Sequence, residues 1–138
     1  MRRHLLDTNI CILLLKSRTP VVQHLARVGP SNCFVSEITI AELLFGVEKG
    51  VEKSSNPEAE RSKLEAFLTS MQPLAISSSL RIYASEKRRL QRLGLTVDDF
   101  DLLIGATALA HDMTMVTNNI KDFNQLQGIV LEDWTKPL

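Results

Sequence analysis

The stretch Leu5-Leu6-Asp7-Thr8-Asn9 decides how this chain is organised, because a short apolar run ends there in three small polar residues. The apolar residues 10–15 follow at once and favour a helix. We therefore predict a buried strand over residues 3–6 that presents Asp7 at its carboxyl end. In open α/β sheets, ligands bind at the carboxyl ends of the strands. The alternative is that Asp7, Thr8 and Asn9 only cap the following helix, since all three are good N-cap residues.

The length and composition of the chain are those of one globular domain. The 138 residues are 44% hydrophobic and 23% charged, which is enough apolar content to bury a core without disulfides. Sixteen basic and sixteen acidic residues give a formal net charge of zero. A nucleic-acid partner would therefore need a local basic face or a metal ion rather than overall charge. We expect a single domain over residues 1–138.

Two further features favour a cytoplasmic protein. Cys11 and Cys33 lie in apolar segments without a CxxC motif or clustered histidines, so we expect two buried thiols rather than zinc or a disulfide. Asp7 and Asn9 interrupt the apolar run after the basic N-terminus, which argues against a signal peptide. No uninterrupted apolar run approaches about 18 residues, so we expect no membrane span.

Short apolar runs alternate with helix-like segments along the rest of the chain. The predicted strands are 3–6, 33–35, 73–76, 114–116 and 129–131, and the predicted helices are 8–16, 19–28, 37–49, 78–93 and 100–110, with another from Pro57 onward. We expect the polar stretch 49–63 to contain a mobile surface connection, and Thr96-Val97-Asp98-Asp99 to form a capping box. This alternation predicts a three-layer α/β/α fold with a short, mainly parallel central sheet of about five strands.

Two more acids stand in unusually apolar surroundings. Glu42 is the only charge between Ile38 and Val47, and a charge in such a helix is rarely buried unless it is paired or binds a metal. Asp101 stands at the head of a long uncharged helical run. The alternatives are that Glu42 lies on an exposed stripe and that Asp101, like Asp98 and Asp99, only complements the helix dipole.

The acids Asp7, Glu42 and Asp101 have no lysine or arginine in a matching apolar setting. Two carboxylates about 6 Å apart repel by about 3 kcal/mol at an effective dielectric constant of 20. A bound cation removes that repulsion, and ligands that are all oxygen favour Mg²⁺, with Mn²⁺ as a substitute. Such an ion can lower the pKa of a bound water and stabilise the leaving oxygen of a phosphodiester. Neither a Gly-rich nucleotide-binding loop nor a nucleophile-elbow serine is present in the sequence.

Other polar residues are candidates for the same site or for contact with a substrate. Thr117, Asn118 and Asn119 follow a predicted strand, so we expect them to face the same pocket as Asp7. Asp122 could add a carboxylate, although a role as a turn residue is equally compatible with its position. The predicted helix 78–93 carries Arg88, Arg89 and Arg92, which either contact phosphates of a ligand or form a solvated face.

Taken in order, these motifs resemble the PIN-domain ribonucleases, and most closely the VapC toxins of bacterial toxin–antitoxin pairs. The similar segments are residues 5–10, 36–43, 101–106, 116–119 with 122–123, and 132–134, which together span nearly the whole chain. The resemblance implies a PIN fold, Mg²⁺-dependent endoribonuclease activity and inhibition by a VapB-like antitoxin. It places Asp7, Glu42 and Asp101 on acidic active-site positions, with Asp7 and Asp101 as the usual metal ligands.

The resemblance also shapes what we expect of the fourth ligand and of the partners. Many relatives carry an aspartate where this chain has Asn119, so we expect one well-held metal, with Glu42 and Asn119 acting through water and Asp122 as the possible replacement. Thr8, Asn9, Thr117 and Asn118 are the further candidates for RNA contact. The implied substrate is tRNA, with the anticodon loop of initiator tRNA as first choice over ribosomal RNA. A homodimer that assembles further with its antitoxin is also implied.

Three other functions are less compatible with these residues. A response-regulator receiver needs an aspartate at the end of a central strand and a lysine on a late strand, and the sequence lacks both. A catalytically silent PIN-like binding module would not need Asp7, Glu42 and Asp101 together. A PIN-related DNA or flap nuclease is disfavoured by the short chain and by the lack of a long helical arch.

Overall fold

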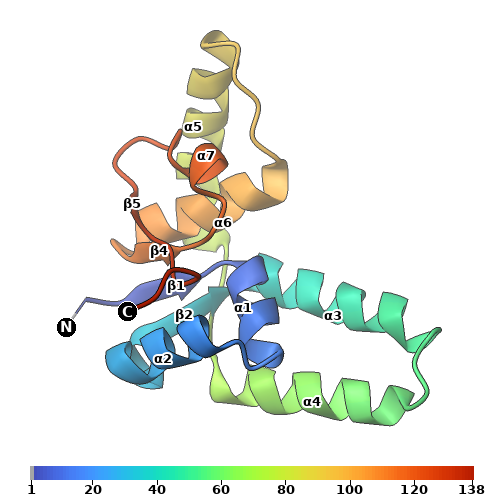
Figure 1. Cartoon of the computed structure of the whole chain (residues 1–138). Coiled ribbons are helices and arrows are strands. Elements are labelled where there is room, and N and C mark those ends of the chain that lie inside the picture. The colour runs from blue at the N-terminus through green and yellow to red at the C-terminus, as the bar shows by residue number, and fades with distance from the viewer. Residues whose placement is uncertain (1) are drawn as a thin grey trace.

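Five short parallel strands form the centre of the computed structural model, which describes residues 2–138 (Figure 1). The strands are β1 (His4–Leu6), β2 (Cys33–Ser36), β3 (Gln72–Leu74), β4 (Thr114–Val116) and β5 (Val130–Glu132), in the order β3-β2-β1-β4-β5. The central strand is β1, in which Leu5 lies opposite Phe34 of β2 and Met115 of β4. Because all strands are parallel, their carboxyl ends meet at one edge of the sheet, where Asp7 follows β1.

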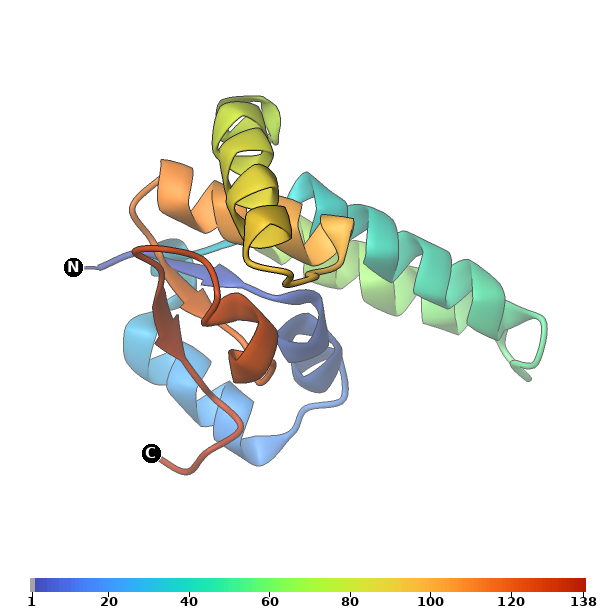
Figure 2. The ribbon, with the colours of Figure 1, turned by 90° about the horizontal axis from the view of Figure 1, so that it is seen from above.

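Helices cover both faces of this sheet, as Figure 2 shows from above. They are α1 (Thr8–Leu15), α2 (Thr19–Val28), α3 (Glu37–Val51), α4 (Pro57–Ser70), α5 (Leu80–Arg92), α6 (Asp99–Ala110) and α7 (Ile120–Phe123). Alternate strand residues point to opposite faces. Leu6 and Val116 therefore join the core with α1 and α2, whereas Leu5 and Met115 pack with Ile104 of α6. The predicted three-layer α/β/α arrangement is confirmed.

Helix α3 is longer than we predicted, whereas α4 begins at Pro57 as predicted. Helix α3 continues to Val51, and α4 begins at Pro57 behind Asn56, whose side chain accepts a hydrogen bond from the Ala59 amide at 3.2 Å. The connection between the two helices therefore covers residues 52–56, and its mobility stays a prediction. Helix α3 is also less buried than its apolar sequence indicates, because the Phe45 side chain is 69% exposed.

Several predicted ends of strands and helices differ from the structure by one or two residues, and two of these differences have a clear physical cause. The third strand covers Gln72–Leu74 rather than 73–76, because its register pairs Gln72 with Phe34 and the chain then turns into the short 3-10 helix Ser77–Ser79. Helix α6 is capped by Asp98 rather than Thr96, since the Asp98 carboxylate accepts from the Phe100 amide at 3.1 Å. The predicted capping box therefore begins two residues before the actual cap.

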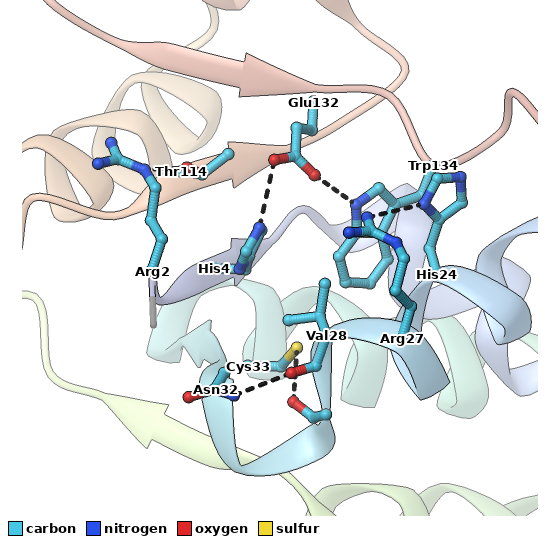
Figure 3. A network of polar contacts seen from close by, with 11 residues as sticks. Arg2, His4, His24, Arg27, Val28, Asn32, Cys33, Thr114, Glu132 and Trp134 are labelled. Atoms are coloured by element: carbon cyan, nitrogen blue, oxygen red, sulfur yellow. Dashed lines mark hydrogen bonds and ion pairs between the residues drawn. The ribbon is translucent and has the colours of Figure 1, made fainter. Parts of the chain in front are cut away.

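A cluster of aromatic and polar side chains holds the segment after β5 against the sheet (Figure 3). Trp134 is fully buried, and its indole nitrogen donates to the Glu132 carboxylate at 3.0 Å. The same carboxylate lies 3.3 Å from Nε2 of His4. The His24 ring of α2 stacks on Trp134 with an interplanar angle of 8°, and its Nε2 donates to the Lys136 carbonyl at 2.9 Å. This cluster joins β1, α2 and the segment after β5.

Two further expectations concern the cysteines and the membrane. Cys11 and Cys33 are free and buried, as predicted, and burial raises the pKa of the Cys33 thiol to about 11. Within residues 2–138, none of the helices combines the length and the apolar character needed to cross a membrane.

Candidate active site

Asp7 lies at the carboxyl edge of the sheet, between the end of β1 and the start of α1. Only 3% of the residue is exposed, and both of its carboxylate oxygens are held from within the protein. The Thr8 amide donates to Oδ1 at 2.7 Å, and the Thr117 hydroxyl donates to Oδ2 at 2.8 Å. Burial raises the pKa of Asp7, these hydrogen bonds lower it in part, and the nearby charge of Glu42 raises it further. Asp7 therefore caps α1, which is the role that we gave as the alternative to a ligand site. It is also a buried carboxylate, and burial makes its negative charge unfavourable.

Glu42 reaches the same place from α3. The residue is half-buried, and its Oε1 lies 2.7 Å from the Thr8 hydroxyl. That hydroxyl lies 3.1 Å from the hydroxyl of Thr39, which is fully buried one helical turn before Glu42. Glu42 is thus neither on an exposed stripe nor fully buried, and it is tied to α1 by a side-chain hydrogen bond.

Asp101 is the most strongly perturbed acid of the site. It lies in the first turn of α6, and its pKa is raised to about 7, first by burial and then by the charges of Asp7, Asp98, Glu42 and Asp122. These acids raise the pKa only because they lie close enough to repel the Asp101 carboxylate. The position of α6 is fixed by Gly105, where an added Cβ would collide with the Leu126 side chain. The sheet edge therefore gathers several carboxylates, and in the described part of the chain no ion pair links Asp7 or Asp101 to a lysine or arginine.

The polar residues after β4 complete the site. The fully buried Thr117 donates its hydroxyl to Asp7 and accepts from the Asn119 amide at 2.9 Å. It therefore positions Asp7, and it is fully buried in the RNA-free protein, while its contact with RNA stays a prediction. The Asn119 side chain donates to the Asp122 carboxylate at 3.1 Å, which joins the two candidates for the fourth ligand. Asp122 lies in the short helix α7 rather than in the predicted turn.

The three candidate arginines of α5 do not behave alike. Arg89 is engaged inside the protein: its guanidinium donates to the buried Glu86 carboxylate at 2.7 Å and to the Gln125 carbonyl at 2.5 Å. Arg88 and Arg92 are exposed, as are Asn9 and Asn118. Phosphate contact therefore stays a prediction for all three arginines, and Arg89 differs from the other two in that its guanidinium already has partners within the protein.

The donor atoms of the site suit a hard cation held largely through water. Among residues 2–138, no three histidine, cysteine or acidic side chains lie close enough together to enclose a metal ion by themselves. Mg²⁺ does not require such a cage, because it usually keeps several waters and binds through one or two carboxylates. Asp7 and Asp101 supply such carboxylates, and their mutual repulsion is the reason for a cation to bind there. The side chains therefore fit Mg²⁺ or Mn²⁺.

Sequence reasoning missed two parts of this site. Thr39 was not singled out, although its hydroxyl contacts Thr8 from a fully buried position on α3. Thr8 is a predicted candidate for RNA contact, whereas its hydroxyl is turned toward Glu42. In the sequence, the only indication of a role for Thr39 is that it lies one helical turn before Glu42, and a small polar residue at that spacing is common in helices.

Comparisons with known proteins agree on one family. The model of the family described as PIN domain matches residues 4–129. The chain is 36% identical to a protein of Rickettsia felis named "Ribonuclease VapC2", with 96% of this chain and 98% of that protein covered. It is 30% identical to the "tRNA(fMet)-specific endonuclease VapC" of Salmonella typhimurium, over 97% of this chain and 99% of that one.

A solved structure shows that the similarity extends to the fold. It is described as VapBC2 from Rickettsia felis bound to a DNA fragment from their promoter. This chain superimposes on it with a TM-score of 0.83 and 32% identity, and the match covers 95% of this chain and 98% of the other.

Proposed function

Because this chain belongs to the PIN domain family, we propose that it is a metal-dependent endoribonuclease toxin of a VapBC-like toxin–antitoxin pair. The observation that carries this proposal is that Asp7, Glu42 and Asp101 lie near one another at the edge of the sheet, and that none of the ion pairs found within residues 2–138 joins them to a lysine or arginine. Repulsion between these carboxylates destabilises the metal-free protein, and the same repulsion favours the binding of Mg²⁺ and, through it, of a phosphodiester. The two VapC relatives support the ribonuclease class through their names.

The residues divide the work of RNA hydrolysis between them. Asp7 and Asp101 would hold the metal, which would supply an activated water and stabilise the charge that develops on the phosphodiester. Thr117 and the Thr8 amide keep the Asp7 carboxylate in one orientation. The pKa of Asp101 is raised to about 7 in the metal-free protein, so its carboxyl group would release a proton near neutral pH when it binds the metal. Glu42 and Asn119 act through water, with Asp122 supporting the Asn119 side chain.

The RNA substrate that we propose is tRNA, with the anticodon loop of initiator tRNA as the first candidate. The support is the 30% identical relative from Salmonella typhimurium, which is named a tRNA(fMet)-specific endonuclease. The overall charge of this chain is zero, so local groups and the metal must attract the phosphates. The exposed residues Asn9, Asn118, Arg88 and Arg92 are the candidates for this contact.

We further propose that a VapB-like antitoxin covers the site in the cytoplasm. The structural match to a VapBC complex supports such a partner. A pocket beside Glu42, between α1, α3 and α4, offers an apolar floor of Ile12, Leu15, Leu43, Val47 and Leu64. Its rim carries charges of both signs, so it suits a peptide segment that brings a cation to the acids. The toxin itself is proposed to be a homodimer that assembles further with the antitoxin.

A digest of total RNA tests the function directly. The purified protein should cleave tRNA with Mg²⁺ or Mn²⁺ present and lose the activity in EDTA, and the cut ends should map to one position in the anticodon loop. Activity that persists in EDTA would contradict the metal, and cuts confined to ribosomal RNA would contradict the substrate. No cleavage under either condition would favour a binding module without catalysis, and cleavage of flap DNA alone would favour the DNA nuclease.

Removal of charge from α5 should separate RNA contact from structural support. In the Arg88→Ala, Arg92→Ala double variant, RNA binding should weaken and the slope of log K against log salt should fall by about 1–2. The matched variant Arg89→Ala should keep the slope, yet lose about 2–3 kcal/mol of stability, because the buried Glu86 loses its ion pair and keeps only the hydrogen bond from the Gln127 amide. Filter binding at several salt concentrations and thermal unfolding measure the two effects. An unchanged slope in the double variant would leave this helix a solvated face.

A further inference from the structure

Thr8 contacts two of the acids of the site at once. Its backbone amide donates to Oδ1 of Asp7 at 2.7 Å. Its hydroxyl lies 2.7 Å from Oε1 of Glu42 and 3.1 Å from the hydroxyl of Thr39. The first residue of α1 thereby links the carboxylate that follows β1 to the carboxylate on α3.

The direction of these hydrogen bonds follows from the number of hydroxyl protons. An ionised carboxylate can only accept, so Thr8 must give its single hydroxyl proton to Glu42. The contact with Thr39 must then use the proton of the Thr39 hydroxyl, which donates to the Thr8 oxygen. A hydroxyl that accepts one hydrogen bond while it donates another is polarised and makes a stronger donor. Thr39, fully buried on α3, therefore orients Thr8 toward Glu42.

The Glu42 side chain has little else to hold it in one orientation. None of the ion pairs found within residues 2–138 joins Glu42 to a lysine or arginine. Gly46, the next residue on this face of α3, leaves open space, because a Cβ added there would meet nothing within 4 Å. Without a hydrogen-bond partner, the Glu42 side chain would exchange between several rotamers. It would then lose conformational entropy each time a substrate binds and fixes it in one of them.

We propose that Thr8 is a positioning residue of the active site, which holds the Glu42 carboxylate beside Asp7 and Asp101 through a hydroxyl that Thr39 orients. This inference rests on the proposed nuclease function. The Thr8→Val substitution keeps the shape of the side chain and removes the hydroxyl, so it lowers kcat by roughly tenfold to a hundredfold, the range for a lost hydrogen bond to a charged group, with KM changed less than about twofold. Thr8→Ser restores most of kcat. Thr19→Val, at the same first position of α2, changes neither constant.

A double-mutant cycle decides whether Thr8 acts through Glu42. In a Glu42→Ala background, Thr8→Val lowers kcat by no more than about twofold, since the group that it positions is gone. An equal loss in both backgrounds means that Thr8 acts independently of Glu42, and this overturns the inference. A wild-type kcat for Thr8→Val alone overturns it too, as does a Thr8→Ser variant that is as slow as Thr8→Val.

Titration of the RNA-free protein with MnCl₂ gives a readout that does not depend on cleavage. Thr8→Val weakens Mn²⁺ binding severalfold in the wild-type background and not in the Glu42→Ala background. If Thr8→Val fails to fold, Thr39→Val removes only the orienting donor and produces a smaller loss in the same direction. A protein that binds Mn²⁺ in this pattern but cleaves no RNA refutes the nuclease function and keeps the role of Thr8. An Mn²⁺ affinity that neither threonine variant changes overturns that role.

Discussion

The Asp7→Asn variant is expected to lose at least about 10²-fold in the rate of RNA cleavage while it keeps its fold, because a positioned catalytic group is removed. An asparagine has the same shape as the aspartate and can keep both local partners. Its carbonyl oxygen accepts from the Thr8 amide, and its NH₂ group donates to the Thr117 hydroxyl. What is lost is the negative charge at the place where we propose that the metal binds.

The stability of the same variant should move in the opposite direction. Burial raises the pKa of Asp7 in the folded protein, which means that its charge weakens the metal-free fold at neutral pH. Thermal unfolding in EDTA should therefore show Asp7→Asn to be at least as stable as the wild type. Asp112→Asn is the matched control, since Asp112 is exposed at the far end of α6 with a φ of 51° that asparagine also tolerates. Cleavage by Asp7→Asn at the wild-type rate would refute the proposed site.

The Asp101→Asn variant should combine a comparable loss of activity with a change in the pH dependence of stability. The pKa of Asp101 is about 7 in the folded protein against an ordinary value of 3.8. Between these values the folded state keeps a proton that the unfolded state has released, so the stability of the metal-free wild type falls as the pH rises from about 4 to about 7. The amide of the variant cannot titrate, and this fall should be reduced by an amount on the order of 2 kcal/mol.

Denaturation in EDTA at pH 4.5 and at pH 8 measures this difference. The variant should be more stable than the wild type at pH 8, and the advantage should shrink at pH 4.5, where the wild-type carboxyl is protonated in the folded state. Cleavage assayed with saturating Mg²⁺ should be reduced about 10²-fold or more across the whole range. A variant without any stability gain at pH 8 would mean that Asp101 is not held among repelling carboxylates.

The features that could be predicted from the sequence are those encoded by neighbouring residues. The run that ends at Leu6 predicts β1 and places Asp7 at its carboxyl end, and Asn56-Pro57 predicts the start of α4. Both depend on side chains acting on their own backbone or on a period that one element repeats. The parallel sheet followed from the alternation of such elements, and the order of its strands did not.

The features that could not be predicted depend on residues that are far apart in the chain. The contact between Thr8 and Glu42 spans 34 residues, and the stack of His24 on Trp134 joins α2 to the segment after β5. Neither has a local pattern, since a threonine at the start of a helix usually serves as a cap. The exposure of Phe45 was missed for a related reason: an apolar helix looks buried until the surface that it faces is known.

The central place of β1 has a consequence for the time at which the protein acquires its activity. The hydrogen bond from Thr117 to Asp7 joins residues 110 positions apart, and β1 pairs with β4 across a similar separation. At the usual pace of translation, roughly 5–20 s pass between the synthesis of Asp7 and that of Thr117. During that interval the ribosome carries a chain that has its first acid but no pocket to hold it. Under the proposed function, the nascent chain would therefore lack its active site for most of its synthesis, and the proposed antitoxin would need to bind it only after β4 has joined the sheet.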